Sequence, residues 1–512
     1  MKKTINNILF AALIVFAAAS CQKELGSEPQ SEGLRTITCY METPSDTKGG
    51  GATLPEWHTG DQIWISNGTS SETKTLEAGD IDGNKVTLST SLSGTLYAVC
   101  PASAQNGVTG GKICIKIPTS TDGAFANAHI AVAQGDGTLS FKNAVTILNI
   151  ATSDEIAAVN ISSTANIAGE FNVAYGPSLT LEAGASQAKS VTLTSSTGGA
   201  RYVAIAPGTA FNTVTFTAIK TATNWAVRTS TSTNSAAINT IYTIGNVADG
   251  SSWTYTGDSN GSLWGQFSVS ADKKVRFSKG NLQATYSGSA YTWDFAEHQY
   301  DYVGDAAGNT SIDSQTDGAV VDLFGWTKKD KYNDGIKQYG INTSETASDY
   351  GDSVSDDLSD WGTLKGSGWR TPSGGDSGEW NYLLSSSGRG SGDTCFKCPV
   401  TVAGKTNCLV IAPDCNTQTI SESYTADEWA IAEKVYGFVC LPAAGYRSVS
   451  SMGEVGTTGY YWSSTPRGDE EDEDDENQDA YYLVFPDYYP GPVYPSGKGG
   501  RSNGRSVRLV TE

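Results

Sequence analysis

The stretch Thr213-Val214-Thr215-Phe216-Thr217-Ala218 alternates hydroxyl-bearing and small or apolar side chains. Because successive side chains of a strand point to opposite faces, this alternation puts Val214, Phe216 and Ala218 on one face and the threonines on the other. We expect similar strands at 145–150, 190–194 and 202–206, with Gly, Asn and Pro between them. The segment from about residue 34 to residue 247 therefore predicts β structure, most economically two packed antiparallel sheets, without a long helix.

Length and charge exclude several classes of protein. At 512 residues the chain predicts two to four domains. A net charge of -21 and the lack of basic clusters argue against nucleic acid as a partner. Three histidines, at 58, 129 and 298, leave little material for histidine-based catalysis.

The N-terminus is typical of an exported lipoprotein. Lys2 and Lys3 precede an apolar stretch, and Ala18-Ala19-Ser20 leads into Cys21. The stretch is too short to cross a bilayer, so we interpret residues 1–20 as a signal peptide and Cys21 as the lipid-bearing (palmitate) residue. Residues 21–34, rich in Ser, Glu and Gly, read as a tether. An ordinary signal peptide remains the alternative.

The remaining cysteines predict disulfides. Eight follow Cys21, at 39, 100, 114, 395, 398, 408, 415 and 440. An even number in an exported protein favours disulfide pairing, although the pairing itself cannot be deduced. Free buried cysteines are the alternative. Residues 395, 398, 408 and 415 also allow a zinc site, but the spacing of the second pair is unlike a zinc ribbon.

Several motifs between residues 35 and 248 resemble the fimbrillin-like domains. They are Thr47-Lys48, Trp57-His58-Thr59-Gly60-Asp61-Gln62-Ile63, Leu96-Tyr97-Ala98-Val99, Phe141-Lys142-Asn143-Ala144, Tyr202-Val203-Ala204-Ile205-Ala206-Pro207 and Tyr242-Thr243-Ile244-Gly245-Asn246-Val247. The resemblance implies two transthyretin-like β-sandwich lobes, at 35–140 and 141–248. It also implies protease cleavage after an arginine, for which Arg35 is the candidate, and assembly with pilin subunits by strand addition. Alternatively, Arg35 is an ordinary exposed residue.

A different domain follows a linker at 249–262. Residues 263–512 are rich in Trp, Tyr and Gly, and helices are expected at 426–434, with Thr425 and Glu428 as a capping box, and around 379–384. The motifs of this domain are Trp369-Arg370-Thr371-Pro372, Glu379-Trp380, Leu441-Pro442-Ala443-Ala444-Gly445-Tyr446-Arg447, Gly459-Tyr460-Tyr461-Trp462-Ser463-Ser464-Thr465, Tyr481-Tyr482-Leu483-Val484-Phe485 and Arg501-Ser502-Asn503-Gly504-Arg505-Ser506-Val507-Arg508. They resemble the C-type-lectin-like, α+β domain of formylglycine-generating enzymes and, more closely, of the variable proteins of diversity-generating retroelements.

That resemblance implies a displayed binding face near the C-terminus, and the composition agrees. The candidate ligand-binding residues are Tyr482, Val484, Asp487, Tyr488, Tyr489, Tyr494, Ser496, Gly497, Lys498, Gly499 and Gly500. Tyrosine offers a large amphipathic contact area, and Ser and Gly allow adaptable hydrogen bonding. With Leu483 and Phe485 facing the core, alternation turns Tyr482 and Val484 outward. Alternatively, these tyrosines pack locally within their strands and turns.

Two other features argue against metal and enzyme chemistry. The eight consecutive acidic residues 469–476 lack the spaced ligands of a calcium loop and are expected to be a solvated insert. The formylglycine-generating type needs a reactive cysteine pair near the C-terminal end, whereas no cysteine follows Cys440. We expect no catalytic residues, no metal and no cofactor. A catalytic pair of carboxylates is the alternative that the many acidic residues leave open.

The sequence therefore predicts a lipid-anchored protein of the outer membrane and cell surface, with a fimbrium as the alternative location. Its C-terminal domain is expected to bind an external protein or glycan, as in an adhesin or a pilus-tip subunit. The expected terminal strand at 507–510 leaves no free donor arm, which favours a tip over the alternative of a polymerising pilin. The second alternative is an enzyme of the formylglycine-generating type.

Overall fold

The computed structural model describes residues 33–43, 45–46, 55–153, 155–194, 198–246, 261–312, 315–326, 340–341, 360–366, 368–414, 416, 418–467, 479–486 and 492–512. The predictions for Cys21, Asp487, Tyr488 and Tyr489 lie outside these residues. So do those for the signal peptide, most of the tether and linker, and the acidic insert.

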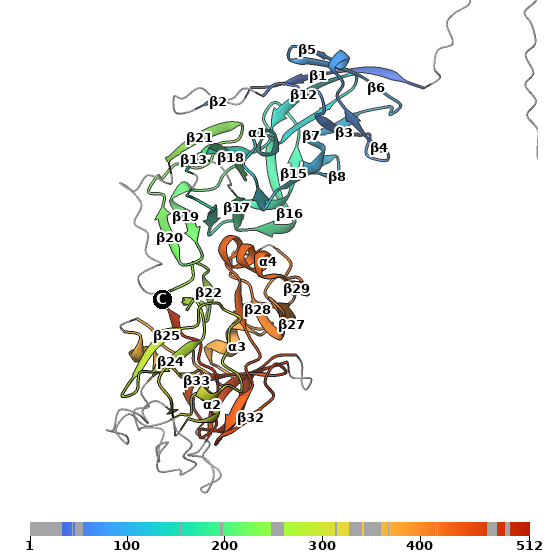
Figure 1. Ribbon diagram of the computed structural model, residues 1–512. Helices are drawn as coiled ribbons and strands as arrows, with labels where there is room; N and C mark the ends of the chain where they lie inside the picture. Colours follow the sequence, from blue (N-terminus) through green and yellow to red (C-terminus); the bar gives the residue numbers. More distant parts are fainter. Residues whose placement is uncertain are drawn as a thin grey trace, which may run out of the picture.

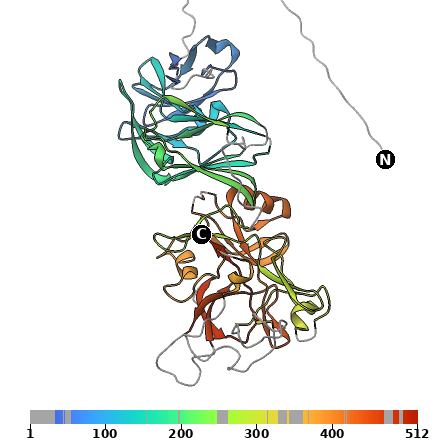
Figure 2. The ribbon, with the colours of Figure 1, turned by 90° about the vertical axis from the view of Figure 1, so that its left-hand side faces the viewer.

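The protein is mainly β, as the sequence predicts, and is built from three units that follow one another along an elongated molecule (Figures 1 and 2). We call them the first lobe, the second lobe and the C-terminal domain. No helix among the described residues has the length and apolar character needed to span a membrane.

The first lobe is one eight-stranded sheet. Its order is β4 (Ser71–Thr75), β3 (Gln62–Ser66), β7 (Leu96–Cys100), β11 (Ala131–Gly135), β12 (Thr138–Asn143), β1 (Arg35–Met41), β6 (Lys85–Thr90) and β5 (Ile81–Asp82). One face lines a single hydrophobic cluster that includes Ile37, Ile63 and Phe141, so the sheet curves around its own core. Trp64, Val99 and Val132 project from the other face into the core of the second lobe. The two lobes therefore share buried surface.

The second lobe has three sheets around that core. They are β10 (Ser120–Thr121), β17 (Ser190–Thr194), β14 (Ala158–Ser163), β19 (Val214–Thr221) and β20 (Asn224–Thr229); β18 (Gly199–Ile205), β13 (Thr146–Thr152), β21 (Thr240–Asn246) and β2 (Ser45–Asp46); and β16 (Thr180–Ala188), β15 (Ala168–Ala174), β9 (Lys112–Ile117) and β8 (Gln105–Thr109). The only α-helix among the described residues here is α1 (Phe125–Ala128). Val214, Phe216 and Ala218 of β19 are buried, as the alternation predicts.

Strand pairing places the lobe boundary differently from the prediction. Residue 140 falls inside β12, and β9 and β10, which precede it, pair with β15 and β17, which follow it. β2 likewise pairs with β21, almost 200 residues later in the chain. A single division in the sequence cannot separate lobes whose strands interleave.

The C-terminal domain consists of short strands around three hydrophobic clusters. Its sheets are β22 (Phe267–Ser268), β23 (Lys274–Phe277) and β36 (Val510–Thr511); β25 (Tyr291–Phe295), β24 (Leu282–Tyr286) and β26 (Val320–Val321); β29 (Ser423–Tyr424), β27 (Phe396–Val402), β28 (Lys405–Ile411) and β30 (Val439–Leu441); β31 (Tyr446–Ser448) and β32 (Ser451–Gly453); and β33 (Gly459–Pro466), β34 (Asp479–Phe485) and β35 (Tyr494–Gly500). Its α-helices are α2 (Ala307–Thr310), α3 (Glu379–Leu383) and α4 (Ala426–Ile431).

Both helices predicted in this domain are present. α4 begins at the predicted capping box, in which the Glu428 backbone N–H donates to Thr425 Oγ1 over 3.3 Å and the Thr425 N–H donates to Glu428 Oε2 over 2.8 Å. A π-helix, η7 (Ala432–Tyr436), continues it. α3 occupies the second predicted position.

The prediction of disulfides is wrong for the described cysteines, all seven of which are free thiols. Five of them, at 39, 100, 114, 408 and 440, are buried, and most of these belong to hydrophobic clusters. Burial raises the pKa of the Cys39 thiol to about 12, which keeps it protonated. These residues serve as small apolar packing groups.

Candidate ligand-binding site

The predicted binding residues that the structure describes come from two adjacent strands, β34 and β35, which form a three-stranded antiparallel sheet with β33. Trp462 pairs with Tyr482, and Tyr482 pairs with Gly497. Directly paired residues project from the same face of a sheet. We call this face the Tyr482 face; it comprises Tyr460, Trp462, Tyr482, Val484, Tyr494, Gly497 and Gly499.

The opposite face is buried, as predicted. Leu483 and Phe485 have no exposed surface and belong to one hydrophobic cluster together with Tyr461. The Tyr482 face is only partly free, because Trp462 and Ala480 belong to a second cluster, against which Tyr482 packs. The sheet therefore lies between two cores, and only part of its surface remains for a ligand.

Val484 is a correction to the prediction. It is 6% exposed and therefore does not extend an outward patch. In the ladder it stands between Tyr460 and Tyr494, whose larger side chains project from the same face. Alternation correctly assigned its face, but burial depends on what stands beside it.

Ser496 is a second correction. It is 5% exposed, and Gly497 is also buried, so neither is a freely adaptable surface group. β35 lies beside α3, and the Tyr482 ring lies against Gly497. Lys498 is exposed, with Nζ 5.6 Å from the centroid of the Tyr481 ring, and Gly499 and Gly500 are half-buried.

The side chain of Arg505 packs against three aromatic rings of the Tyr482 face. Its guanidinium lies 3.8 Å from the centroid of the Tyr482 ring and 4.2 Å from that of Trp462, and Tyr460 is 5.8 Å away. The side chain is 5% exposed, and its Nε and Nη1 have no hydrogen-bond partner in the part of the chain that the structure describes. Burial lowers the pKa of Arg505 to about 10, so the group stays a cation at neutral pH. The aromatic faces are its main stabilising contacts.

Two glycines make room for this stack. A Cβ at Gly497 would lie 2.6 Å from Cε2 of Tyr482, and one at Gly499 would lie 2.9 Å from Nη2 of Arg505. Any larger residue would displace the ring or the guanidinium. The glycines of β35 therefore position Tyr482 rather than supply flexibility.

Tyr446 and Tyr460 extend the aromatic group, and neither was predicted as a site residue. Their rings are 5.4 Å apart, and the Tyr460 hydroxyl donates to Glu454 Oε2 over 2.8 Å. Burial and the nearby Glu454 raise the pKa of Tyr460. Alternation in the motif Gly459-Tyr460-Tyr461-Trp462 was a signal for Tyr460; for Tyr446 the signal lay only in tertiary contact.

Several residues of the C-terminal motifs are structural anchors. The Arg370 guanidinium forms a bidentate ion pair with Glu379, with nitrogen–oxygen distances of 2.5 and 2.6 Å. Arg447 and Arg508 are fully buried, and Arg508 Nη2 donates to Gln299 Oε1 over 2.7 Å. These contacts connect separate parts of the C-terminal domain.

The site has the features of a binding surface. It offers aromatic rings, one buried guanidinium and one exposed lysine. No group of three or more His, Cys, Asp or Glu side chains within the described ranges is arranged to hold a metal ion.

Arg35 begins β1, and its guanidinium pairs with Asp136 and donates to the Gly94 carbonyl over 2.7 Å. β1 lies inside the sheet, between β12 and β6. A cut after Arg35 would therefore leave Thr36 to Met41 in place and would open no groove there. Cleavage at Arg35 itself stays a prediction.

Neither family models nor curated proteins match this sequence. Among solved structures, the chain is similar to a candidate cell adhesion protein of Bacteroides uniformis, with 15% identity over 44% of this chain and 97% of that protein and a TM-score of 0.28. A candidate cell adhesion protein of Bacteroides ovatus is 18% identical over 43% of this chain and 95% of its own length, with a TM-score of 0.26. A fimbrial protein of Bacteroides ovatus is 9% identical over 93% of this chain and 99% of its own, with a TM-score of 0.22. Similarities at this level do not identify a family for this chain.

Proposed function

We propose that this chain is a cell-surface lipoprotein that binds an external protein or glycan through the Tyr482 face of its C-terminal domain. The observation that carries the proposal is the packing of Tyr460 and Tyr482 on the guanidinium of Arg505, with Tyr446 packed on Tyr460 and all three tyrosines half-buried. Rings that are already fixed lose little conformational entropy when a ligand binds. Tyrosine also supplies both apolar contact and a hydroxyl for hydrogen bonding.

We further propose that the C-terminal domain is C-type-lectin-like and that the fimbrillin-like lobes carry it away from a lipid at Cys21. Such a protein would act as an adhesin or at the tip of a pilus. Because β1 stays in its sheet after a cut at Arg35, we place a tethered adhesin ahead of a polymerising pilin. A binding role is also placed ahead of a formylglycine-generating activity, which would need a cysteine pair after Cys440.

The binding proposal is tested with the full mature chain on arrays of glycans and extracellular proteins. Tyr494→Ala combined with Lys498→Ala removes a half-buried ring and an exposed cation, while Tyr482 and Arg505 stay in contact. We expect binding to every captured spot to weaken by about tenfold or more. Tyr40→Ala is the matched control, since Tyr40 is a 38% exposed tyrosine of the first lobe. Unchanged binding by the double variant, or no spot bound by the wild type, would refute the proposal.

The anchor is tested separately. Cells expressing the chain are labelled with palmitate, and the Cys21→Ser variant is compared with the Cys39→Ser variant, whose cysteine lies in the buried face of β1. We expect label only when Cys21 is present. Label retained by the Cys21→Ser variant would contradict lipidation at this residue.

A further inference from the structure

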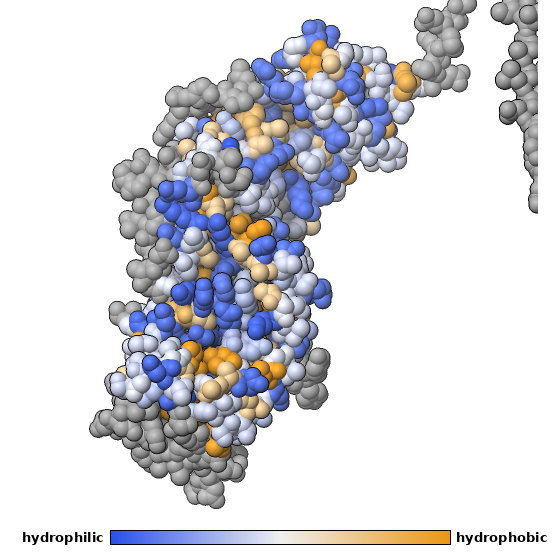
Figure 3. Space-filling model, viewed as in Figure 1, coloured by the Kyte–Doolittle hydropathy of each residue, from blue (hydrophilic) through white to orange (hydrophobic). Residues whose placement is uncertain are grey.

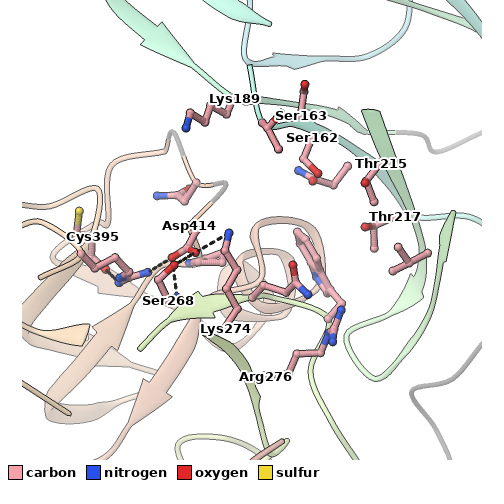
Figure 4. A pocket seen from close by; sticks show the side chains of 18 of the residues that line it. Ser162, Ser163, Lys189, Thr215, Thr217, Ser268, Lys274, Arg276, Cys395 and Asp414 are labelled. Carbon is pink, nitrogen blue, oxygen red and sulfur yellow. Dashed lines mark hydrogen bonds and ion pairs between the residues drawn. The ribbon is translucent and has the colours of Figure 1, made fainter. Parts of the chain in front are cut away.

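A cleft of about 770 Å³ lies where the second lobe meets the C-terminal domain. The five-stranded sheet of the second lobe forms one wall, and β22, β23 and the segments around Arg389 and Asp414 form the other (Figure 4). In the space-filling view, hydrophilic residues gather at the level of β22 (Figure 3). In Figure 1, β33 of the Tyr482 face lies farther down the C-terminal domain, so the cleft is a separate place on the molecule.

The two walls are joined by a small apolar contact. Trp225 of β20 and Trp264 belong to one buried cluster with Ala158, Ile219 and Val435. A backbone hydrogen bond also joins the two walls, since the Trp264 N–H donates to the Ala222 carbonyl over 3.1 Å. These packed residues connect the two walls of the cleft and hold them at a defined separation.

The wall from the second lobe is lined with hydroxyl and amide groups. The polar side of the alternating stretch on β19 supplies Thr215 and Thr217, whose apolar neighbours point into the core. Asn160 pairs with Thr217, and Ser162 with Thr215, which in turn pairs with Thr229. Asn160 and Thr217 thus form a polar row across two strands, and Ser162, Thr215 and Thr229 form a second row across three strands. All five residues line the cleft.

The charge of the cleft is opposite to that of the whole protein. The charged residues that line it are Lys189, Lys274, Arg276, Arg389 and Asp414, which is four cations and one anion, a net charge of +3. The chain as a whole carries -21. A local excess of cations attracts anionic ligands, even on a protein whose overall charge is negative.

Asp414 is already neutralised by its neighbours. Ser268 Oγ donates to it over 2.6 Å, Lys274 Nζ lies 3.0 Å away and Arg389 Nη1 lies 3.5 Å away. Hydrogen bonds from Ser268 and the charge of Lys274 lower the pKa of Asp414 although its burial opposes this. The carboxylate therefore does not compete for the other two cations.

Lys189 and Arg276 are the other two cations that line the cleft. Neither forms an ion pair with any carboxylate that the structure describes. The Arg276 guanidinium stacks 4.4 Å from the centroid of the Trp225 ring, and its Nε is buried without a hydrogen-bond partner in the described ranges. Burial lowers the pKa of Arg276 to about 10, so it remains charged at neutral pH. Arg276 is thus held in a fixed orientation at the cleft, with Lys189 across from it (Figure 4).

We propose that this cleft binds an acidic carbohydrate, with its carboxylates on Arg276 and Lys189 and its hydroxyls on the Ser, Thr and Asn rows of the second lobe. A planar guanidinium suits a carboxylate, and a lysine adds a point charge. Hydroxyl and amide rows match the many donors and acceptors of a sugar, which a purely ionic anion site would not need. The volume falls within the range of roughly 300–1,000 Å³ typical of small-ligand sites. This inference does not depend on the role of the Tyr482 face.

The experiment is calorimetric titration of the full mature chain, at low ionic strength, with tetragalacturonate and with a chondroitin tetrasaccharide. The methyl ester of tetragalacturonate keeps the hydroxyls and removes the charge. We expect at least one of the two acids to bind, the affinity to fall as salt is added, and the ester to bind about tenfold or more weakly.

Variants locate the site. Lys189→Gln changes an exposed residue and should weaken binding about tenfold; Arg276→Gln should weaken it more, whereas Arg276→Lys should restore part of it. Lys85→Gln, which removes the same charge from β6 in the first lobe, should change nothing. Tyr494→Ala on the Tyr482 face should also leave this binding intact, so failure of either proposal can be recognised separately.

Three results would overturn the inference. They are absence of binding by both acids, equal binding of the acid and its ester, and binding of tetraglutamate as tight as that of the sugars. The last would indicate an acidic peptide as ligand.

Discussion

The guanidinium of Arg505 lies 3.8 Å from the centroid of the Tyr482 ring, on the face of the sheet opposite Leu483. Two residues that are 23 positions apart in the chain thus form the centre of the candidate binding face. The stack explains why the neighbouring strand carries glycine at 497 and 499. It also couples the stability of the domain to the geometry of its surface.

Replacement of Arg505 by lysine should destabilise the C-terminal domain. An ammonium group cannot stack flat on Tyr482 and Trp462, so we expect a loss of about 2 kcal/mol in the free energy of unfolding. Denaturant unfolding measures it. Arg228→Lys, at an exposed arginine of β20, is the control and should change stability by less than about 0.5 kcal/mol. Equal stability of the two variants would argue against the stack.

Gly497→Ala should displace the Tyr482 ring. The added Cβ would lie 2.6 Å from Cε2, and we expect a cost of about 1–3 kcal/mol together with weaker ligand binding. Gly79→Ala is matched to it, because a Cβ there meets nothing within 4 Å. Unfolding and near-ultraviolet circular dichroism report on both; an unchanged aromatic spectrum for Gly497→Ala would count against the proposed packing.

Arg370→Met should leave the buried carboxylate of Glu379 without its bidentate partner. Glu379 is 12% exposed and would keep only Lys273, 3.5 Å away, and the Ser373 N–H as partners. We expect a loss of about 2–3 kcal/mol. Adding Glu379→Leu removes the stranded charge and should recover part of that loss. A double variant as unstable as the sum of the single variants would show that the pair is not coupled.

Removal of β1 should open the first lobe, whereas removal of the residues before it should not. A chain beginning at Thr36 keeps Ile37, Cys39 and Met41, which are buried, and should stay folded. A chain beginning at Glu42 leaves β12 and β6 without their shared neighbour and should lose that fold. A synthetic peptide of the Arg35–Met41 sequence should restore it, and a scrambled peptide should not. Thermal unfolding with each peptide gives the answer.

Stability should fall in weak acid partly because of His129. This residue is 5% exposed, and burial lowers its pKa to about 4 from an ordinary value of 6.5. The unfolded chain binds the proton first, so His129 favours unfolding increasingly as pH falls from about 6.5 to 4, by about 3 kcal/mol at most.

Asp322 works in the opposite sense, because burial raises its pKa to about 6 and the folded state then takes up the proton first. Comparison of His129→Leu with the wild type isolates the histidine. Above pH 6.5 the free energies of unfolding of the two proteins should change with pH at the same rate. Below pH 6.5 the free energy of the wild type should fall relative to that of His129→Leu. Parallel profiles across that window would contradict the assignment.

Local patterning was enough to predict several elements. Alternation on β19 assigned Val214, Phe216 and Ala218 to the core, and the Thr425 and Glu428 pair located the start of α4. Both depend on contacts within a few residues, which the order of side chains states directly. Lobe boundaries were less predictable, because β9 and β10 pair with strands far along the chain.

The sequence by itself determined which side of each strand is apolar, where the capped helix begins and how rich in tyrosine the C-terminal strands are. Only the tertiary structure decided that Val484 is buried, that Arg505 stacks on Tyr482, and that Lys189 of one unit faces the same cleft as Arg276 of another. Alternation specifies two faces of a strand, but what covers each face depends on strands and loops brought there by folding.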